Sequence, residues 1–122
     1  MMKTVLVDTN IILWTFNGGP DFRDAIGDAA PGYDIAVPNC VITELEKLDT
    51  RESRAALKYC KKVKTIDIGQ GYADKMLVSA SEEGYVIATN DSGLLKELEK
   101  RKLSALRIRG KNKLIPAGSE LI

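Results

Sequence analysis

Four carboxylates stand where strands are expected to end and helices to begin. Asp8 and Asp91 each follow a short apolar run and precede a segment with helical periodicity, whereas Glu44 and Asp74 lie in the first turns of two other expected helices. In a parallel sheet such positions share one edge. Four negative charges at one edge repel one another unless a cation joins them, and oxygen ligands alone select Mg²⁺ or Mn²⁺. For Asp8 or Asp91 taken alone, helix capping is the favoured alternative; for an acid in a first turn, the alternative is a favourable interaction with the helix dipole.

The residue types that are missing narrow the chemistry further. The sequence contains no histidine, which excludes His-based acid–base catalysis, Ser-His-Asp triads and the commonest zinc sites. Cys40 and Cys60 lack zinc-motif partners and a secretory context, so both are expected to be small buried residues. Catalysis would therefore rest on carboxylates. Because Mg²⁺ and Mn²⁺ commonly bind substrate phosphates, the carboxylate set points to phosphoryl or phosphodiester chemistry.

The elements that position these carboxylates follow from hydrophobic patterning. Strands alternating with helices predict one α/β domain over residues 1–122, a three-layer α/β/α sandwich with a central, mainly parallel sheet. Strands are expected at residues 4–7, 34–37, 63–68, 85–88 and 104–109, with a last short strand at 114–115 before a frayed end at 116–118. Helices are expected at residues 11–16, 21–30, 39–48, 51–62, 72–83 and 92–102. Thr50 is the expected N-cap of the fourth helix, although Glu52 is not at the position that a capping box requires.

Charge and hydropathy bear on partners and location. Net charge is only +1, but residues 96–113 are strongly basic and residues 58–64 form a second basic cluster. This distribution suggests an anionic partner such as nucleic acid, although on charge alone solvated helix and strand faces are the favoured explanation. No apolar run approaches the roughly 20 residues that cross a bilayer, and the N-terminus lacks a signal-peptide pattern. We therefore expect a cytoplasmic protein without a membrane partner.

Four segments together resemble the PIN-domain family, small α/β metal-dependent ribonucleases. They are Val-Asp-Thr-Asn at 7–10, the segment 37–45, Ala73-Asp74, and Ile-Ala-Thr-Asn-Asp at 87–91, and the resemblance spans residues 3–115. It implies an acidic catalytic cluster that binds Mg²⁺ or Mn²⁺, formed by Asp8, Glu44, Asp74 and Asp91. It also implies four polar residues that orient this cluster, namely Thr9, Asn10, Thr89 and Asn90. Within the family, the chain is most similar to the archaeal branch, which is similar to PIN proteins that process pre-ribosomal RNA; toxin members of toxin–antitoxin pairs come next.

The implied activity is hydrolysis of RNA phosphodiester bonds to 5′-phosphate and 3′-hydroxyl products. Basic side chains would bind the RNA backbone with strongly salt-dependent affinity; they are Arg101, Lys102, Arg107, Arg109, Lys111 and Lys113. Trp14, Tyr72 and Tyr85 are candidates for stacking on unpaired bases, but core packing is favoured for each. The resemblance leaves open a homodimer and a protein partner, either a ribosome-assembly factor or an antitoxin.

The sequence departs from the family pattern at one position and leaves three alternatives open. Lys75 stands beside Asp74, where many relatives have a second acidic residue, so the sequence leaves open whether one or two ions bind. The first alternative is a catalytically silent PIN-like module for RNA binding or assembly. An aspartyl-nucleophile phosphatase is disfavoured because Asn10 stands where its second Asp is required. A receiver domain is disfavoured because the sequence lacks a clear match to its paired acids and its lysine.

Overall fold

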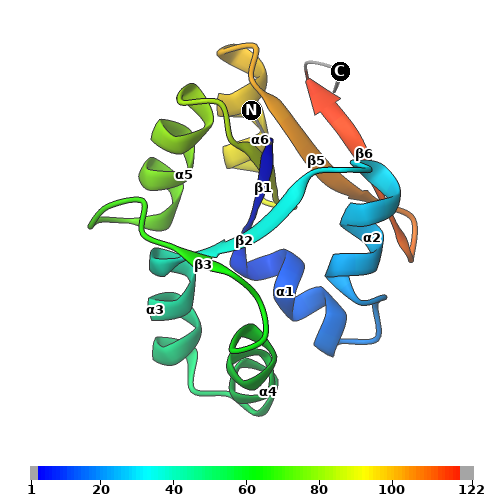
Figure 1. Ribbon diagram of the computed structural model, residues 1–122, viewed down its shortest axis with the longest axis vertical. Helices are drawn as coiled ribbons and strands as arrows, with labels where there is room; N and C mark the ends of the chain where they lie inside the picture. The colour runs from blue at the N-terminus through cyan, green and yellow to red at the C-terminus, as the bar shows by residue number, and fades with distance from the viewer. Residues whose placement is uncertain (1–2, 119–122) are drawn as a thin grey trace.

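The computed structural model of the protein describes residues 3–118. Within this range the strands are β1 (Thr4–Val7), β2 (Asp34–Pro38), β3 (Thr65–Ile66), β4 (Val86–Ala88), β5 (Ser104–Arg109) and β6 (Lys113–Gly118). The helices are α1 (Thr9–Phe16), α2 (Phe22–Ala29), α3 (Asn39–Leu48), α4 (Arg51–Cys60), α5 (Ala73–Glu82) and α6 (Ser92–Lys100). Figure 1 shows this alternation along the chain, with α3 and α4 below the sheet in that view.

The strands form one six-stranded sheet in the order β3-β2-β1-β4-β5-β6. Every pair is parallel except β5 with β6, which is antiparallel. The chain builds outward from β1 to β3 on one side and then continues with β4 on the other side of β1. The carboxyl ends of β1 and β4 therefore flank the point where the strand order reverses, which is where open α/β sheets bind ligands.

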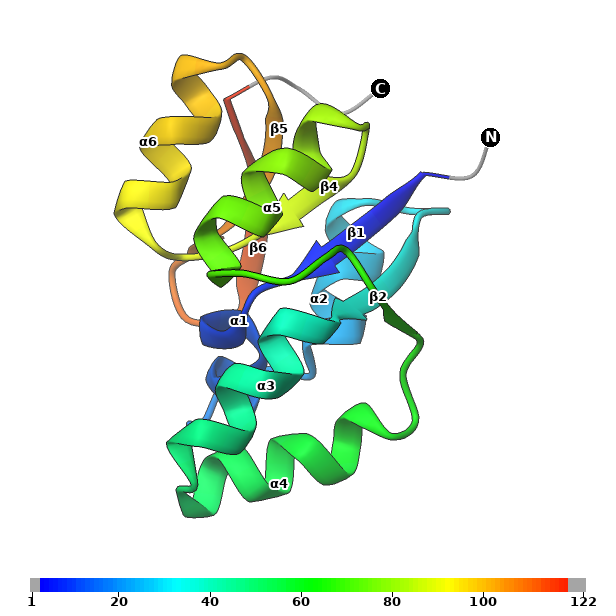
Figure 2. The ribbon, with the colours of Figure 1, turned by 90° about the vertical axis from the view of Figure 1, so that its left-hand side faces the viewer.

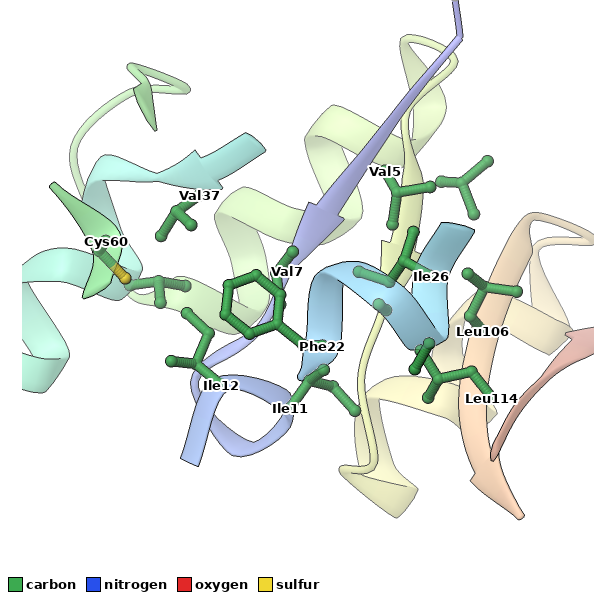
Figure 3. Close-up of a cluster of buried hydrophobic side chains, with 14 of the residues drawn as sticks. Val5, Val7, Ile11, Ile12, Phe22, Ile26, Val37, Cys60, Leu106 and Leu114 are labelled. Atoms are coloured by element: carbon green, nitrogen blue, oxygen red, sulfur yellow. The ribbon is translucent and has the colours of Figure 1, made fainter. Parts of the chain in front are cut away.

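The two faces of the sheet carry different apolar clusters because successive side chains of a strand point in opposite directions. On one face, Leu6 lies level with Ala36 and Ile87, and Ile87 with Ala105; this row packs against buried leucines of α5 and α6. The other face packs on residues from α1 to α4, including Phe22 and Ile26 (Figure 3). Figure 2 shows α5 and α6 on the near side of the sheet. The predicted three-layer sandwich is confirmed.

The end of the described chain differs from the prediction. Instead of fraying at Pro116, β6 runs from Lys113 to Gly118 and pairs along its length with β5. Proline is tolerated there because β6 is the edge strand, where a missing N–H need not break a ladder. At the opposite edge, β3 is shorter than expected and pairs with β2 only at Thr65 and Ile66.

The start of α4 has a capping box that uses Ser53 rather than an acidic residue. Thr50 N donates to Ser53 Oγ at 2.7 Å, and Ser53 N donates to Thr50 Oγ1 at 3.0 Å. Ser53 is fully buried, so its hydroxyl is held in place. The box was not predicted because Glu or Gln is expected at this position, whereas here serine supplies the acceptor on a shorter side chain. Cys60 at the end of α4 and Cys40 in α3 are buried free thiols, as expected.

Thr50→Ala is expected to lower the free energy of unfolding by about 1 kcal/mol, because it removes the oxygen that accepts the Ser53 N–H. Urea unfolding measures the loss. Thr50→Ser keeps the acceptor and is the matched control, with a loss of only a few tenths of a kcal/mol. Equal losses in the two variants would contradict a capping role for the Thr50 hydroxyl.

Candidate active site

Register explains which polar residues meet at the carboxyl edge of the sheet. Val7 of β1 pairs with Ala88 of β4, so the next residues, Asp8 and Thr89, lie side by side. The backbone continues this alignment, since Asp8 N donates to the Ala88 carbonyl at 2.9 Å. Asp91 lies two residues beyond Thr89. The residue that aligns with Asp8 just after β4 is therefore a threonine, and the two are in direct contact.

Asp8 is buried, with 5% of its surface exposed, and both of its carboxylate oxygens accept hydrogen bonds. Its Oδ1 accepts from Thr9 N at 2.8 Å, which caps α1. Its Oδ2 accepts from the Thr89 hydroxyl at 2.7 Å and from Asn10 Nδ2 at 3.2 Å. The favoured capping explanation for Asp8 is thus correct, but it accounts for only one of the two carboxylate oxygens.

Electrostatics disfavour the charged form of Asp8. Burial raises the pKa of its carboxyl above the ordinary value, and the hydrogen bonds from Thr89 and Thr9 offset part of that rise. Repulsion from Glu44 and Asp74 raises the pKa further, so both carboxylates lie within electrostatic reach of Asp8. Among the described residues, the ion pairs involve none of these three acids. A divalent cation beside these carboxylates would offset that repulsion.

Hydrogen bonds link the start of α1 to the segment between β4 and α6 around Asp8. Besides donating to Asp8, the Thr89 hydroxyl accepts from Asp91 N at 3.1 Å and from Asn10 Nδ2 at 3.4 Å. Asn10 Oδ1 in turn accepts from Asn90 N at 2.8 Å. Of the four polar residues that the resemblance named as orienting groups, Asn10 and Thr89 take part in this network through their side chains, whereas Thr9 and Asn90 take part through their backbone N–H groups. Thr9 Oγ1, also buried here, has no hydrogen-bond partner among the described residues.

The other carboxylates surround Asp8 less closely. Asp91 is exposed, and its Oδ1 accepts from Leu94 N at 3.0 Å to cap α6. Glu44 lines a groove beside α3, whereas Asp74 lines a separate groove between α5 and α6. Within residues 3–118, no three acidic or cysteine side chains are grouped closely enough to hold a metal ion. The donor chemistry fits a hard divalent cation, and the buried Thr9 oxygen leaves an unused acceptor beside Asp8. The structure does not draw the four carboxylates into one closed site.

A family model described as a PIN like domain matches residues 5–111. The chain belongs to this family. A similar solved structure is that of the PIN domain endonuclease Utp24, which is 23% identical, with a TM-score of 0.83 over 98% of this chain and 95% of that chain. At this identity the likeness shows the fold. None of the curated proteins matches the chain.

The basic residues of this PIN-like domain divide between two places. Arg107, Arg109, Lys111 and Lys113 are exposed on the β5–β6 hairpin, which extends beyond the last paired residue of β4, Ala88. They are therefore on the same edge of the sheet as Asp8. Arg101 and Lys102 follow α6, at the opposite edge, and Arg101 pairs with Glu82 and with Glu97, the latter at 2.7 Å. Arg101 lines the same groove as Asp74, but at the end of that groove where it pairs with Glu82 of α5.

The aromatic residues also divide. Trp14 and Tyr85 are partly buried against the two apolar clusters, as expected for core packing. Tyr72 is 83% exposed, so the expectation of core packing was wrong for this residue. The reason is that Tyr72 precedes α5 and has no place in its apolar stripe. Sequence reasoning also missed the groove beside Tyr72; its signal was the pair of glycines at 69 and 71, which mark a bend next to a helix start.

Proposed function

We propose that this PIN-like domain is a metal-dependent endoribonuclease acting in the cytoplasm, with Mg²⁺ or Mn²⁺ held at the carboxyl edge of the sheet by Asp8, Glu44, Asp74 and Asp91. The observation that carries the proposal is Asp8 itself. It is buried at the point where the strand order reverses, is repelled by Glu44 and Asp74, and has no ion-pair partner among the described residues. A protein that only needed a helix cap there would have no use for two further carboxylates that repel the charge of Asp8.

Each part of the edge has a role in this proposal. Asp8 is the anchoring ligand, fixed in orientation by Thr89 and Asn10. Asp91, Glu44 and Asp74 complete the shell directly or through water. The bound ion would activate a water molecule and neutralise charge on the phosphate. Arg107, Arg109, Lys111 and Lys113 would bind the phosphates on either side of the cleaved bond. That the similar solved structure is of an endonuclease supports this reading.

For the substrate, we favour pre-ribosomal RNA on the strength of the resemblance to the archaeal branch; a ribonuclease toxin controlled by an antitoxin is the alternative.

A silent RNA-binding module is a second candidate. One observation favours it: the carboxylates, as described, do not close into one site. Lys75, exposed next to Asp74, adds a positive charge where an ion would have to bind. Metal dependence separates the silent module from the enzyme.

Purified protein is expected to cleave RNA with Mn²⁺ or Mg²⁺ and not with EDTA, in assays on a structured and an unstructured RNA. Asp91→Asn is the control for co-purifying nucleases, since asparagine caps α6 equally well but supplies no carboxylate. Because Asp91 is exposed and already engaged in capping, we expect a loss of about tenfold, corresponding to about 1.4 kcal/mol. Salt-sensitive RNA binding without cleavage under any of these conditions would favour the silent module.

A further inference from the structure

Tyr72 is the most exposed large apolar side chain among the described residues. It is 83% exposed, whereas the other large exposed residue, Leu48, is 45% exposed. Its backbone is extended, with φ −67° and ψ 138°, and it occupies the N-cap position of α5 without a side-chain cap hydrogen bond. Neither packing nor capping therefore explains an aromatic ring at this position. Exposed aromatic rings of this kind are typical of binding surfaces.

Tyr72 lies on a groove that reaches the candidate site. The groove has a volume of about 730 Å³ and runs between α3 and the segment that joins β3 to α5. Figures 1 and 2 show this segment beside the start of α3. One wall carries Glu44 and Lys47, and the other ends at Ala73, next to Asp74. Two of the proposed metal ligands thus stand at or beside the same groove as the exposed ring.

The wall that presents Tyr72 is held by specific contacts. Asn39 binds it from α3, since its Nδ2 donates to the Gly69 carbonyl at 3.0 Å and its Oδ1 accepts from Ile68 N at 2.9 Å. Gly69 and Gly71 have φ of +109° and +143°, which side-chain-bearing residues rarely adopt. A Cβ at Gly71 would also approach Met76 Cε at 3.2 Å. The segment is therefore built into one conformation that leaves the ring outside.

We propose that Tyr72 is a stacking platform for an unpaired base of the RNA substrate, next to the bond that is cleaved. This inference rests on the proposed function. The groove is not basic, since Glu44 and Asp67 outweigh Lys47, so it is unsuited to hold phosphates by charge alone. A ring face binds any base through stacking, without regard to sequence. A base already stacked and paired in a duplex cannot use it, so the ring selects single-stranded RNA.

Binding of a short fluorescent single-stranded RNA in EDTA tests this role apart from cleavage. Tyr72→Ala is expected to weaken binding about tenfold, whereas binding of the same RNA annealed to its complement changes by less than about twofold. Tyr72→Trp should retain wild-type affinity because it keeps a ring. Leu48→Ala, which removes exposed apolar surface at the far end of α3 and outside the groove, should have no effect.

Any of these results with the variants would overturn the proposal: unchanged binding by Tyr72→Ala, equal losses for single-stranded and duplex RNA, or failure of Tyr72→Trp to restore affinity. Lack of measurable single-stranded RNA binding by the wild type would overturn it too. If the nuclease proposal is wrong, the pattern is different: wild type shows no metal-dependent cleavage, while Tyr72→Ala still weakens the binding of single-stranded RNA. The reverse pattern is metal-dependent cleavage by wild type together with unchanged RNA binding by Tyr72→Ala. It would support the nuclease proposal and overturn the stacking role of Tyr72.

Discussion

Asp8→Asn is expected to lower metal-dependent RNA cleavage by about 10³-fold, because a carboxylate that anchors the ion supplies several kcal/mol of transition-state stabilisation and each 1.36 kcal/mol is tenfold in rate. The substitution changes charge but almost no volume. Asparagine also caps a helix as well as aspartate does, so the hydrogen bond from Thr9 N is kept. We therefore expect loss of function without loss of fold, with the free energy of unfolding within about 1 kcal/mol of wild type at neutral pH in EDTA.

The difference in the free energy of unfolding between Asp8→Asn and wild type depends on pH with a defined sign. Burial and the repulsion from Glu44 and Asp74 raise the pKa of Asp8 in the folded protein above its ordinary value. Ionisation of Asp8 is therefore harder in the folded than in the unfolded chain, so it lowers the free energy of unfolding. This effect is absent below the unfolded pKa and grows as pH rises from there through the raised folded pKa. The stability of Asp8→Asn relative to metal-free wild type should accordingly increase as pH rises above about 4, the ordinary pKa of an aspartate. Urea unfolding at several pH values measures this difference.

Added Mn²⁺ should reverse the order of stability of wild type and Asp8→Asn. Binding at 100 times the dissociation constant stabilises the folded state by about 2.7 kcal/mol, so wild type should gain several degrees of melting temperature and Asp8→Asn much less. Asp24→Asn, at an exposed acid in the first turn of α2, is the matched control and should behave as wild type. Equal Mn²⁺ stabilisation of Asp8→Asn and wild type would rule out Asp8 as the anchoring ligand.

The layout of the edge was predictable because it depends on local patterns. A short apolar run that stops at a polar residue and passes into a helix is visible in the sequence at both Asp8 and Asp91, and parallel strands bring such ends to one edge. What the sequence does not contain is the register between strands. Asp8 and Asp91 have the same local pattern, yet pairing of Val7 with Ala88 places Thr89, not Asp91, beside Asp8. As a result one aspartate is buried and the other exposed.

The exposure of side chains at helix starts could not be predicted from sequence patterns either. Tyr72 precedes α5, and its surroundings are set by Asn39, which bonds to the segment before it from a distant part of the chain. Likewise, Arg101 and Arg107 belong to one basic stretch of sequence, but α6 and β5 run in opposite directions. The turn between them therefore lies at the far edge of the sheet, and Arg107 returns to the near one. Charge along the chain predicted a basic surface but not its division.

The Thr89 hydroxyl joins Asp8 to the segment that carries Asp91, and Thr89→Val is the substitution that isolates its role. Valine keeps the shape of a fully buried side chain and removes only the oxygen that donates to Asp8 Oδ2 and accepts from Asp91 N. Residues that orient a metal ligand typically contribute 10- to 100-fold in metal affinity or activity, so we expect cleavage to fall by about that factor. The buried partners left without hydrogen bonds should also cost about 1–3 kcal/mol of stability.

A pH profile distinguishes this orienting role from general destabilisation. The Thr89 hydrogen bond lowers the pKa of Asp8, so its removal raises that pKa and should move the acid limb of the cleavage profile to higher pH. A variant that is merely less stable would lose amplitude at every pH without such a shift. Thr89→Ser retains the hydroxyl and should restore both the rate, to within about threefold, and the wild-type acid limb. If serine rescues neither, the methyl packing of Thr89 matters rather than its hydroxyl, and Asp8 does not depend on this bond for its function.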